Sequence, residues 1–379
     1  MKISLWKLFK YFLKLGSFGF GGPVALVGYM QRDLVEKERW VSQDEFSQGV
    51  ALSATLPGPL AAQVAMWIGY LRQGFWGCTI ASVGLIGPPF ILVLAFSAIY
   101  VMYEEAPWIR ALFYGIGPAV AALIAEACYR LSRRYVTDWK MAILALVCLM
   151  VTVIVQAEMA ILFITGGLGG VLLYGRPCRK SGEKPSTSAI RGFAGVSLAG
   201  LFGSLALSKT GELGLFFIKA GAFTFGSGLA VAPFIHQGLV LENHWLTERQ
   251  FLDTVAMGMI TPGPVVIMST FAGYLIDGVR GAVVASVAVF LPIYLMVIFA
   301  ASFFIRHRDN PTVSGFVKGA TTAAVGSISG AGIIIARGVV IDWLTAVIAS
   351  VGLLLIMRWK TPGLAIVAVS GLIGLWVYR

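Results

Sequence analysis

Long stretches of this chain carry uncharged, mostly apolar side chains. Neither Gly77–Met102 nor Gly281–Ile305 contains an Asp, Glu, Lys or Arg residue, and each could cross about 30 Å of hydrocarbon as a helix. The composition agrees, with 58% hydrophobic and 12% charged residues, whereas soluble domains carry about 25% charged residues. Lipid offers an open sheet edge no hydrogen-bond partner. We therefore predict an all-α, polytopic integral membrane protein without β-sheet.

The chain also repeats itself at a nearly constant spacing. Phe12–Gly21 matches Phe217–Gly226, and Pro57-Gly58-Pro59 matches Pro262-Gly263-Pro264, both at an offset of 205 residues. One deletion then changes the offset to 204, and the match continues through the apolar segments that follow. Chance does not keep one register over so much sequence, so we predict two tandem copies of one helical unit.

The distribution of basic residues predicts that the two copies are inverted. The first repeat is expected in residues 1–175 and the second in 205–379. Residues 176–204 form a basic linker and the start of one extra transmembrane helix, at about 192–207. The loop Arg130–Lys140 holds four basic residues, whereas its counterpart in the second repeat holds only Arg337. Because basic loops face the cytoplasm, the extra helix turns the second repeat over.

Each repeat begins with helical segments that are too short to cross a bilayer. Breaks rich in Gly or Pro separate these segments, one of which is Leu60–Arg72. Ser42 and Glu45 have the spacing of a capping box, so a helix should start near Gln43. We predict broken or re-entrant helices here. Four spans should follow, near 76–102, 107–130, 140–156 and 159–175.

The two Pro-Gly-Pro tripeptides are the first candidate anion site. Proline ends one helix and suits the first turn of the next. A helix that begins in mid-membrane points free N–H groups and a positive dipole end into the protein. A simple kink relieved by glycine is the alternative. The predicted site consists of Pro57, Gly58, Pro59, Pro262, Gly263 and Pro264, with the neighbouring side chains of Gln63 and Ser269.

The second candidate is a pair of glycine-rich breaks, Gly19–Pro23 and Thr224–Gly228. Glycine exposes backbone amides, so Gly21, Gly22, Gly226 and Ser227 are predicted to contact substrate. Close packing of helices through glycine is the competing explanation.

Lys14 and Lys219 occupy equivalent positions inside apolar segments. A lysine at membrane depth is costly, which makes it a functional candidate. The alternative is that its ammonium group reaches the headgroups along an extended side chain. We include both lysines among the predicted substrate-binding residues.

Further charged residues suggest accessory roles. Arg32 and Arg39 could form a basic vestibule, or belong to a solvated run of both charge signs. Glu126 and Asp253 could carry a coupling proton if burial favours their neutral form. A structural ion pair is the alternative for each.

Other functional classes lack support. The four cysteines are scattered, and the three histidines show no ligand spacing, so we predict no metal and no cofactor. The net charge of +11 comes from basic residues at the ends of apolar runs, so we expect the lipid bilayer as a partner and no nucleic acid. The sequence leaves a homodimer open.

Several motifs together resemble the chromate ion transporter family. They are Phe18–Pro23, Arg39–Ser42 with Glu45-Phe46, and Leu56–Pro59 in the first repeat, and Phe223–Gly226, Trp245–Thr247 and Thr261–Pro264 in the second. The combination is specific although each motif alone is not, and the resemblance covers nearly the whole chain. The second repeat has His244 at the place of Arg39 and Gly228 at the place of Pro23, so the halves are not equivalent.

The resemblance implies a two-domain member in the bacterial inner membrane, for which we expect a cytoplasmic N-terminus and a periplasmic C-terminus. It implies a secondary active transporter that exports chromate, driven by the membrane potential or the proton gradient, and leaves open whether sulfate or another oxyanion is the substrate. A passive anion channel is one alternative. An intramembrane enzyme is another, but the sequence offers no nucleophile with a base and no metal cluster at membrane depth, so we predict that the chain is not an enzyme.

Overall fold

The computed structural model describes residues 3–19, 22–103, 106–155, 159–174, 208–223, 225–226, 228–300 and 311–377. The predicted linker and extra helix, as well as Gly21 and Ser227, lie outside these residues. The first repeat contains α1 (Leu5–Phe18), α2 (Gly22–Met30), the π-helix η1 (Gln31–Lys37), α3 (Gln43–Thr55), β1 (Gly58–Pro59), α4 (Leu60–Tyr103), α5 (Pro107–Tyr135), α6 (Trp139–Val155) and α7 (Met159–Tyr174).

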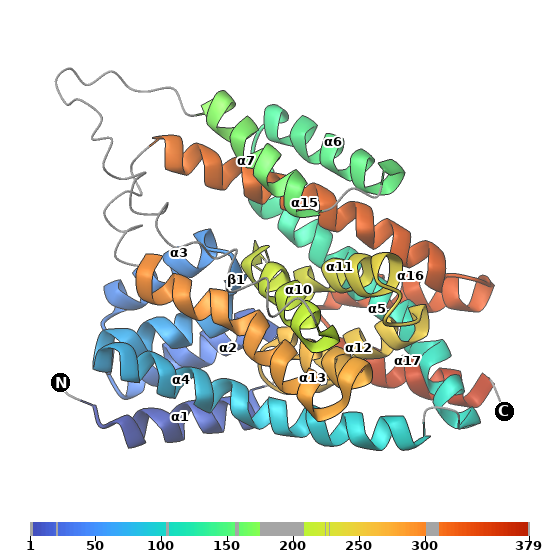
Figure 1. The fold of residues 1–379 in the computed structure, drawn as a ribbon, viewed down its shortest axis with the longest axis horizontal. Coiled ribbons are helices and arrows are strands. Elements are labelled where there is room, and N and C mark those ends of the chain that lie inside the picture. Colours follow the sequence, from blue (N-terminus) through green and yellow to red (C-terminus); the bar gives the residue numbers. More distant parts are fainter. Residues whose placement is uncertain are drawn as a thin grey trace.

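The second repeat follows the same plan with more short pieces in its first half (Figure 1). It contains α10 (Lys209–Phe223), β2 (Phe225–Gly226), the 3₁₀-helix η2 (Gly228–Val231), α11 (Ala232–Ile235), the π-helix η3 (His236–Glu242), α12 (Glu248–Ile260), the 3₁₀-helix η4 (Val265–Ile267), α13 (Met268–Leu295), the π-helix η5 (Met296–Ala300), α15 (Pro311–Val339), α16 (Trp343–Trp359) and α17 (Gly363–Val377).

The helices have the length and composition of membrane spans. Four apolar stretches in the described residues are long enough to cross a bilayer, namely Leu60–Tyr103, Pro107–Tyr135, Val265–Phe299 and Ser314–Val339. The shorter α6, α7, α16 and α17 are apolar as well. Large apolar side chains face outward on the shorter helices, with Leu172 83% and Trp376 80% exposed, which suits contact with lipid. The chain is a membrane protein, and the four spans predicted in the first repeat correspond to the second part of α4, to α5, to α6 and to α7.

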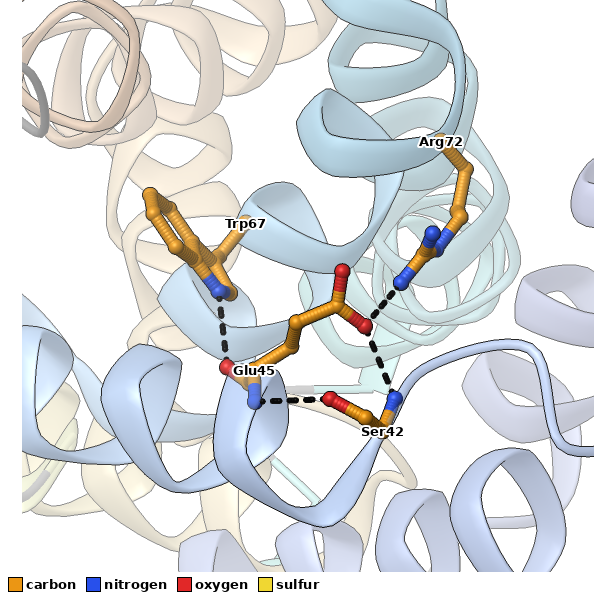
Figure 2. A network of polar contacts seen from close by, with 4 residues as sticks. All are labelled: Ser42, Glu45, Trp67 and Arg72. Atoms are coloured by element: carbon orange, nitrogen blue, oxygen red, sulfur yellow. Dashed lines mark hydrogen bonds and ion pairs between the residues drawn. The ribbon is translucent and has the colours of Figure 1, made fainter.

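The short segments of the first repeat form two re-entrant hairpins. The Lys7 ammonium group at the start of α1 lies 2.7 Å from Glu38, just past η1, and holds the pKa of Glu38 below its usual value. The second hairpin closes where Arg72, at the end of the first part of α4, binds Glu45 at the start of α3 (Figure 2). We call this closed end, defined by Lys7, Glu38, Glu45 and Arg72, the base of the first repeat.

Glu45 has several partners in Figure 2, which explains why α3 and α4 stay together. Its carboxylate accepts from the backbone N–H of Ser42 at 2.8 Å, and the Ser42 hydroxyl accepts from the Glu45 N–H at 3.2 Å. The predicted capping box is therefore confirmed. The Trp67 indole N–H donates to the Glu45 carbonyl oxygen at 3.3 Å. Since α3 has 13 residues, it is about 20 Å long, and the hairpin returns to its own side of the membrane.

A sharp turn in each repeat links the second hairpin to a full span. In α4 the backbone departs from helix at Gln73 and Gly74, and in α13 it departs at Asp277 and Gly278. The two glycines have φ of 58° and 55°, a conformation that glycine adopts without steric cost. The segment before each turn is thus a short helix that folds back against the span after it.

The two repeats are inverted with respect to each other. Tyr100, near the far end of α4, donates a hydrogen bond to Asp253 in the middle of α12 and packs edge-on against Phe271, near the start of α13. At the other end of the span, the hydroxyl groups of Thr79 in α4 and Tyr294 in α13 lie 2.6 Å apart. The two long helices are therefore antiparallel, and the hairpins of the second repeat start from the opposite side of the molecule. This confirms the inverted repeat that the loop charges predicted.

The last two helices of each repeat pack against the other repeat. The pair α6–α7 lies along α15, and the pair α16–α17 lies along α5 (Figure 1). Close contacts without bulky side chains allow this, as where Gly170 meets Gly319 and Gly115 meets Gly374. The exchange makes the repeats depend on each other for burial of their spans.

Candidate functional site

The breaks of all four hairpins meet between the two repeats. Gly58 and Pro59 of β1 pair with Phe225 and Gly226 of β2 as a two-residue parallel ladder, which the prediction of no β-sheet did not include. On the other side, the N–H of Gly263 donates to the carbonyl oxygen of Gly19 at 3.1 Å. We call these four breaks the tips. Each Pro-Gly-Pro tip binds the glycine-rich tip of the opposite repeat.

Glycine is required at the centre of both Pro-Gly-Pro tips. Gly58 has φ of 133° and Gly263 has φ of 91°, values that a residue with a Cβ rarely adopts. A Cβ at Gly58 would lie 2.6 Å from Nε2 of Gln63, and a Cβ at Gly263 would lie 3.0 Å from Cγ of Pro89. Both the backbone conformation and the available space therefore exclude larger residues.

Helices begin at each tip. The helix α2 starts at Gly22, α4 starts at Leu60 directly after Pro59, and η4 leads into α13 from Val265. The N–H groups of a first helical turn have no partner inside the helix, and the aligned peptide dipoles place partial positive charge there. A Cβ at Gly228 would lie 3.2 Å from the Val266 nitrogen, so this glycine leaves room beside the start of η4.

Two buried polar side chains lie next to these helix starts. Gln63 is 0% exposed, and its Nε2 donates to the carbonyl oxygen of Pro57 at 2.6 Å. Its Oε1 has no hydrogen-bond partner among the described residues, and neither has Oγ of the fully buried Ser269 on α13. A buried polar atom without a partner costs about 1–3 kcal/mol. Such atoms, beside helix starts that favour negative charge, are what a site for a polar ligand would present.

Asp253 is buried at the contact between the repeats. It is 0% exposed and accepts a hydrogen bond from the hydroxyl of Tyr100. Nε of Arg249, one turn earlier on α12, lies 3.9 Å from its Oδ2. The Tyr100 ring packs edge-on against Phe271 of α13, with centroids 5.0 Å apart. The Asp253 carboxylate therefore lies between a hydroxyl of the first repeat and a guanidinium group of its own helix.

The lysines predicted to bind substrate lie elsewhere. Lys14 on α1 and Lys219 on α10 are both exposed, whereas the backbone of the neighbouring Gly16 and Gly221 is buried against α4 and α13. An exposed position is what the alternative explanation expects, in which the ammonium group reaches the headgroups along an extended side chain. We therefore leave both lysines out of the proposed site.

The predicted vestibule and the second candidate acid are also placed outside the tips. Arg32 is exposed and binds Asp33 at 3.1 Å, and Arg39 is exposed with φ of 51°. Both belong to the polar loop at the base of the first repeat. Nε of Arg130 donates to Glu126 at 2.9 Å within α5. Glu126 thus forms an ion pair within its own helix, whereas Asp253 joins the two repeats through Tyr100, so we keep Asp253 as the candidate for a coupling proton.

Sequence reasoning missed the partners of Asp253 and one further pair. Tyr100 and Arg249 were not singled out, nor was the contact between His236 and Glu248. A comparison of the repeats position by position marks Asp253, because Gln48 occupies the equivalent place, but it does not find the partners. The change from the amide of Gln48 to the acid of Asp253 can be read from the sequence. The residue of the other repeat that Asp253 contacts is far away in the sequence and cannot.

Comparison with known proteins identifies the family. The family model described as chromate transporter matches residues 6–171 and 211–375, which are the two halves that meet at the tips. The chain belongs to the chromate transporter family. No solved structure matches it.

Curated relatives of the family align along almost the full length. The chain is 42% identical over 377 residues to a chromate transport protein of Cupriavidus metallidurans, covering 99% of this chain and 94% of the relative. It is 42% identical over 361 residues to a probable chromate transport protein of Synechococcus elongatus, covering 94% and 90%. An uncharacterized transporter of Methanocaldococcus jannaschii is 26% identical over 381 residues, covering 98% and 94%. The transporter relatives agree with the prediction that the chain is not an enzyme.

Proposed function

We propose that this chain is a secondary active transporter that exports a small oxyanion, with chromate as the substrate. The observation that carries the proposal is the meeting of Gly58, Gly263 and the two glycine-rich tips between inverted repeats. Helix starts at the tips favour negative charge, and the site lies where two antiparallel halves can move against each other. The names of the relatives supply the choice of chromate.

The substrate site comprises backbone amides more than charged side chains. The first turns of α2, α4 and η4–α13 supply N–H groups, and Ser269 supplies a buried hydroxyl that can donate, whereas the unpaired Oε1 of Gln63 can only accept, from water or a protonated oxyanion. A tetrahedral oxyanion has oxygens in all directions, so donors that converge from both repeats suit it. The tip segments themselves contain no Lys or Arg, which suits release, because a permanent ion pair in a medium of low dielectric constant holds its ligand strongly.

The orientation follows from the charges of the two ends. Lys7, Lys10, Lys37 and Arg72 gather at the base of the first repeat, so we assign this end to the cytoplasm of a bacterial inner membrane. The N-terminus is then cytoplasmic and the C-terminus periplasmic. A potential that is negative inside drives a dianion outward with about 4.6 kcal/mol per 100 mV, which makes export the favoured direction.

Asp253 is the proposed site of a coupled proton. A buried carboxylate next to Tyr100 and Arg249 changes its interactions when it gains a proton, since the attraction to Arg249 is then lost. Because Tyr100 and Asp253 belong to different repeats, a change in this contact alters how the repeats are held together. A proton bound there would therefore be linked to the movement that exposes the substrate site.

The test is chromate uptake into inverted membrane vesicles from cells that produce the chain, with sulfate as competitor and with or without a protonophore. Energy-dependent accumulation of chromate that sulfate inhibits would support the proposal. Accumulation that a protonophore leaves unchanged, and that follows only an imposed concentration gradient, would instead indicate a passive anion channel. No chromate movement by correctly inserted protein would contradict the proposed substrate.

A further inference from the structure

The two repeats differ at several polar positions outside the tips. At four places the first repeat has a neutral glutamine where the second repeat has an ionisable residue. The pairs are Gln31 and His236, Gln43 and Glu248, Gln48 and Asp253, and Gln73 and Asp277. Asp253 is part of the proposed function above. The first two pairs concern a separate contact, which the proposed function does not use.

His236 and Glu248 form a direct contact at the second repeat. Nε2 of His236 lies 2.9 Å from one carboxylate oxygen of Glu248 and 3.0 Å from the other. The imidazole is buried, with its side chain 3% exposed, whereas the Glu248 side chain is 58% exposed. The ring also packs edge-on against Phe251, with centroids 4.9 Å apart. The pair therefore joins a buried imidazole to a carboxylate in contact with water.

The equivalent contact in the first repeat is neutral and weaker. Nε2 of Gln31 lies 3.5 Å from Oε1 of Gln43, at the limit of hydrogen-bond distance. Both contacts join the first residue of a π-helix to the first residue of the following α-helix. π-helical turns are rare and occur often at functional sites. The two repeats thus make this contact between equivalent positions, and only the pair in the second repeat has side chains that can change their charge.

The contact connects two hairpins of the second repeat. His236 begins η3, which is the returning arm of the first hairpin, and Glu248 begins α12, which is the outgoing arm of the second. The tips of these hairpins carry Gly226 and Gly263, which belong to the proposed substrate site. A change in the strength of this contact therefore alters the joint between two elements that hold the substrate.

Other charges around the imidazole come from the elements packed on it. The π-helix η3 carries Glu242, and His244 follows it, while α12 carries Arg249 and Asp253 beside Glu248. The helix α10 contacts η3 where Phe216 lies against Gly238, and it carries Lys209, Glu212 and Lys219. The helix α15 packs on α11 and carries Lys318 and Arg337. Within the described part of the chain, Glu248 is the acid whose carboxylate contacts the His236 ring.

We propose that His236 and Glu248 form a proton-binding site that sets the pH dependence of transport from the side of the second repeat. Imidazole is the side chain that gains or loses its charge between pH 5 and 8. With the extra proton the contact is an ion pair between His236 and Glu248, and without it a hydrogen bond that the neutral ring donates to the carboxylate. The inference rests on the proposed function for its transport readout, but the binding of the proton does not.

Protonation strengthens the joint between the hairpins. Without the proton the hydrogen bond already has an ionised acceptor in Glu248. Protonation adds the attraction between imidazolium and carboxylate, and a buried imidazolium needs its partner more than an exposed one does. The imidazole takes one proton from the solution on the side of Glu248 and returns it there. In the orientation assigned above this is the periplasmic side.

The test compares the double variant His236→Gln/Glu248→Gln with the wild-type chain in proteoliposomes, between pH 5.5 and 8 on the side of the second repeat. The double variant reproduces the pair found in the first repeat, which is compatible with the fold. We expect the ratio of variant to wild-type chromate transport to change about threefold or more across this range, where imidazole titrates. The ratio cancels the titration of chromate itself. A ratio that stays constant with pH would overturn the proposal.

The matched control is His244→Gln. His244 lies at the end of the same segment, is exposed, and contacts the carbonyl oxygen of Val240 through Nδ1 at 2.9 Å. Its removal takes away an imidazole and leaves the pair of His236 and Glu248 in place. We expect the wild-type pH profile for this variant. If the ratio of His244→Gln to wild-type transport changed with pH as it does for the double variant, loss of any histidine would explain the effect. That result would contradict the proposed pair.

A second measurement does not depend on transport. Amide hydrogen exchange of η3 and α12 in the purified full chain, corrected for the intrinsic effect of pH, should show greater protection at pH 5.5 than at pH 8 in the wild type and no such difference in the double variant. Equal protection at both values in the wild type would refute the site even if chromate is transported. If wild-type chain moves no chromate but shows the difference, the proposed function fails and this site stands.

Discussion

The backbone N–H of Gly263 donates a hydrogen bond to the carbonyl oxygen of Gly19, 3.1 Å away. The two residues are far apart in the sequence and lie at the tips of hairpins from opposite repeats. The ladder between β1 and β2 makes the corresponding connection for the other Pro-Gly-Pro tip. The substrate site proposed for this family member is therefore held by backbone contacts between the repeats, and its properties depend on residues that set backbone conformation.

Gly263→Ala should abolish chromate transport while the chain still inserts into the membrane. The new Cβ would be strained at φ of 91° and would lie 3.0 Å from Cγ of Pro89, so the tip must shift away from Gly19 or Pro89. The measurement is chromate uptake per unit of inserted protein. Gly87→Ala is the control, since a Cβ at Gly87 meets no atom within 4 Å. Equal loss in both variants would show that the effect is not specific to the tip.

Asp253→Asn should separate exchange from accumulation. The amide retains the size of the carboxylic acid and can still accept from Tyr100, but it cannot bind and release a proton. We expect the variant to exchange chromate across the membrane at equilibrium and to lose accumulation driven by a proton gradient. Wild-type accumulation by this variant would remove Asp253 from the coupling mechanism.

Glu45→Gln should destabilise the base of the first repeat by about 1.5–3 kcal/mol, the range for hydrogen bonds to a charged group. Arg72, whose side chain is 16% exposed, loses its charged partner. The helix cap should survive, because Gln250 occupies the equivalent position and completes a capping box in the second repeat. Thermal unfolding of the detergent-solubilised chain measures the loss. An unchanged midpoint would mean that the ion pair does not hold the hairpin together.

Tyr174→Phe should lower stability at neutral pH and have no effect in strong acid. The Tyr174 hydroxyl donates to Asp138 at 2.5 Å and holds the pKa of this carboxyl below its usual value. The contribution is therefore complete above the pKa of the unfolded chain, about 3.9, and is lost as the pH falls through the lower pKa of the folded chain. Unfolding midpoints of both proteins at pH 7 and near pH 3 provide the check. A difference that persists in acid would point to packing instead.

Much of the fold could be predicted because its signals are local. The Pro-Gly-Pro breaks, the short segments between them and the cap formed by Ser42 and Glu45 are visible in the sequence, and the structure has them where expected. The offset of 205 residues and the reversed loop charges predicted two inverted repeats, because topology depends on the number of spans and on where basic residues lie.

The candidate site could be predicted only in part. The tips at Gly58 and Gly263 were found because glycine between prolines is unusual in an apolar segment. For Lys14 and Lys219, the sequence shows that a charge lies in an apolar helix, but not which face of that helix is covered. The structure leaves both exposed, since α1 and α10 turn their glycine faces toward α4 and α13.

The sequence by itself determined the class of protein, the two repeats, their inversion and the positions of the breaks, because apolar length, loop charge and the chemistry of proline and glycine act within a few turns of the chain. Only the tertiary structure decided that Gly263 meets Gly19, that Tyr100 reaches Asp253 and that His236 meets Glu248. These contacts join different hairpins or different repeats. Their existence depends on how whole helices pack, which no local pattern records.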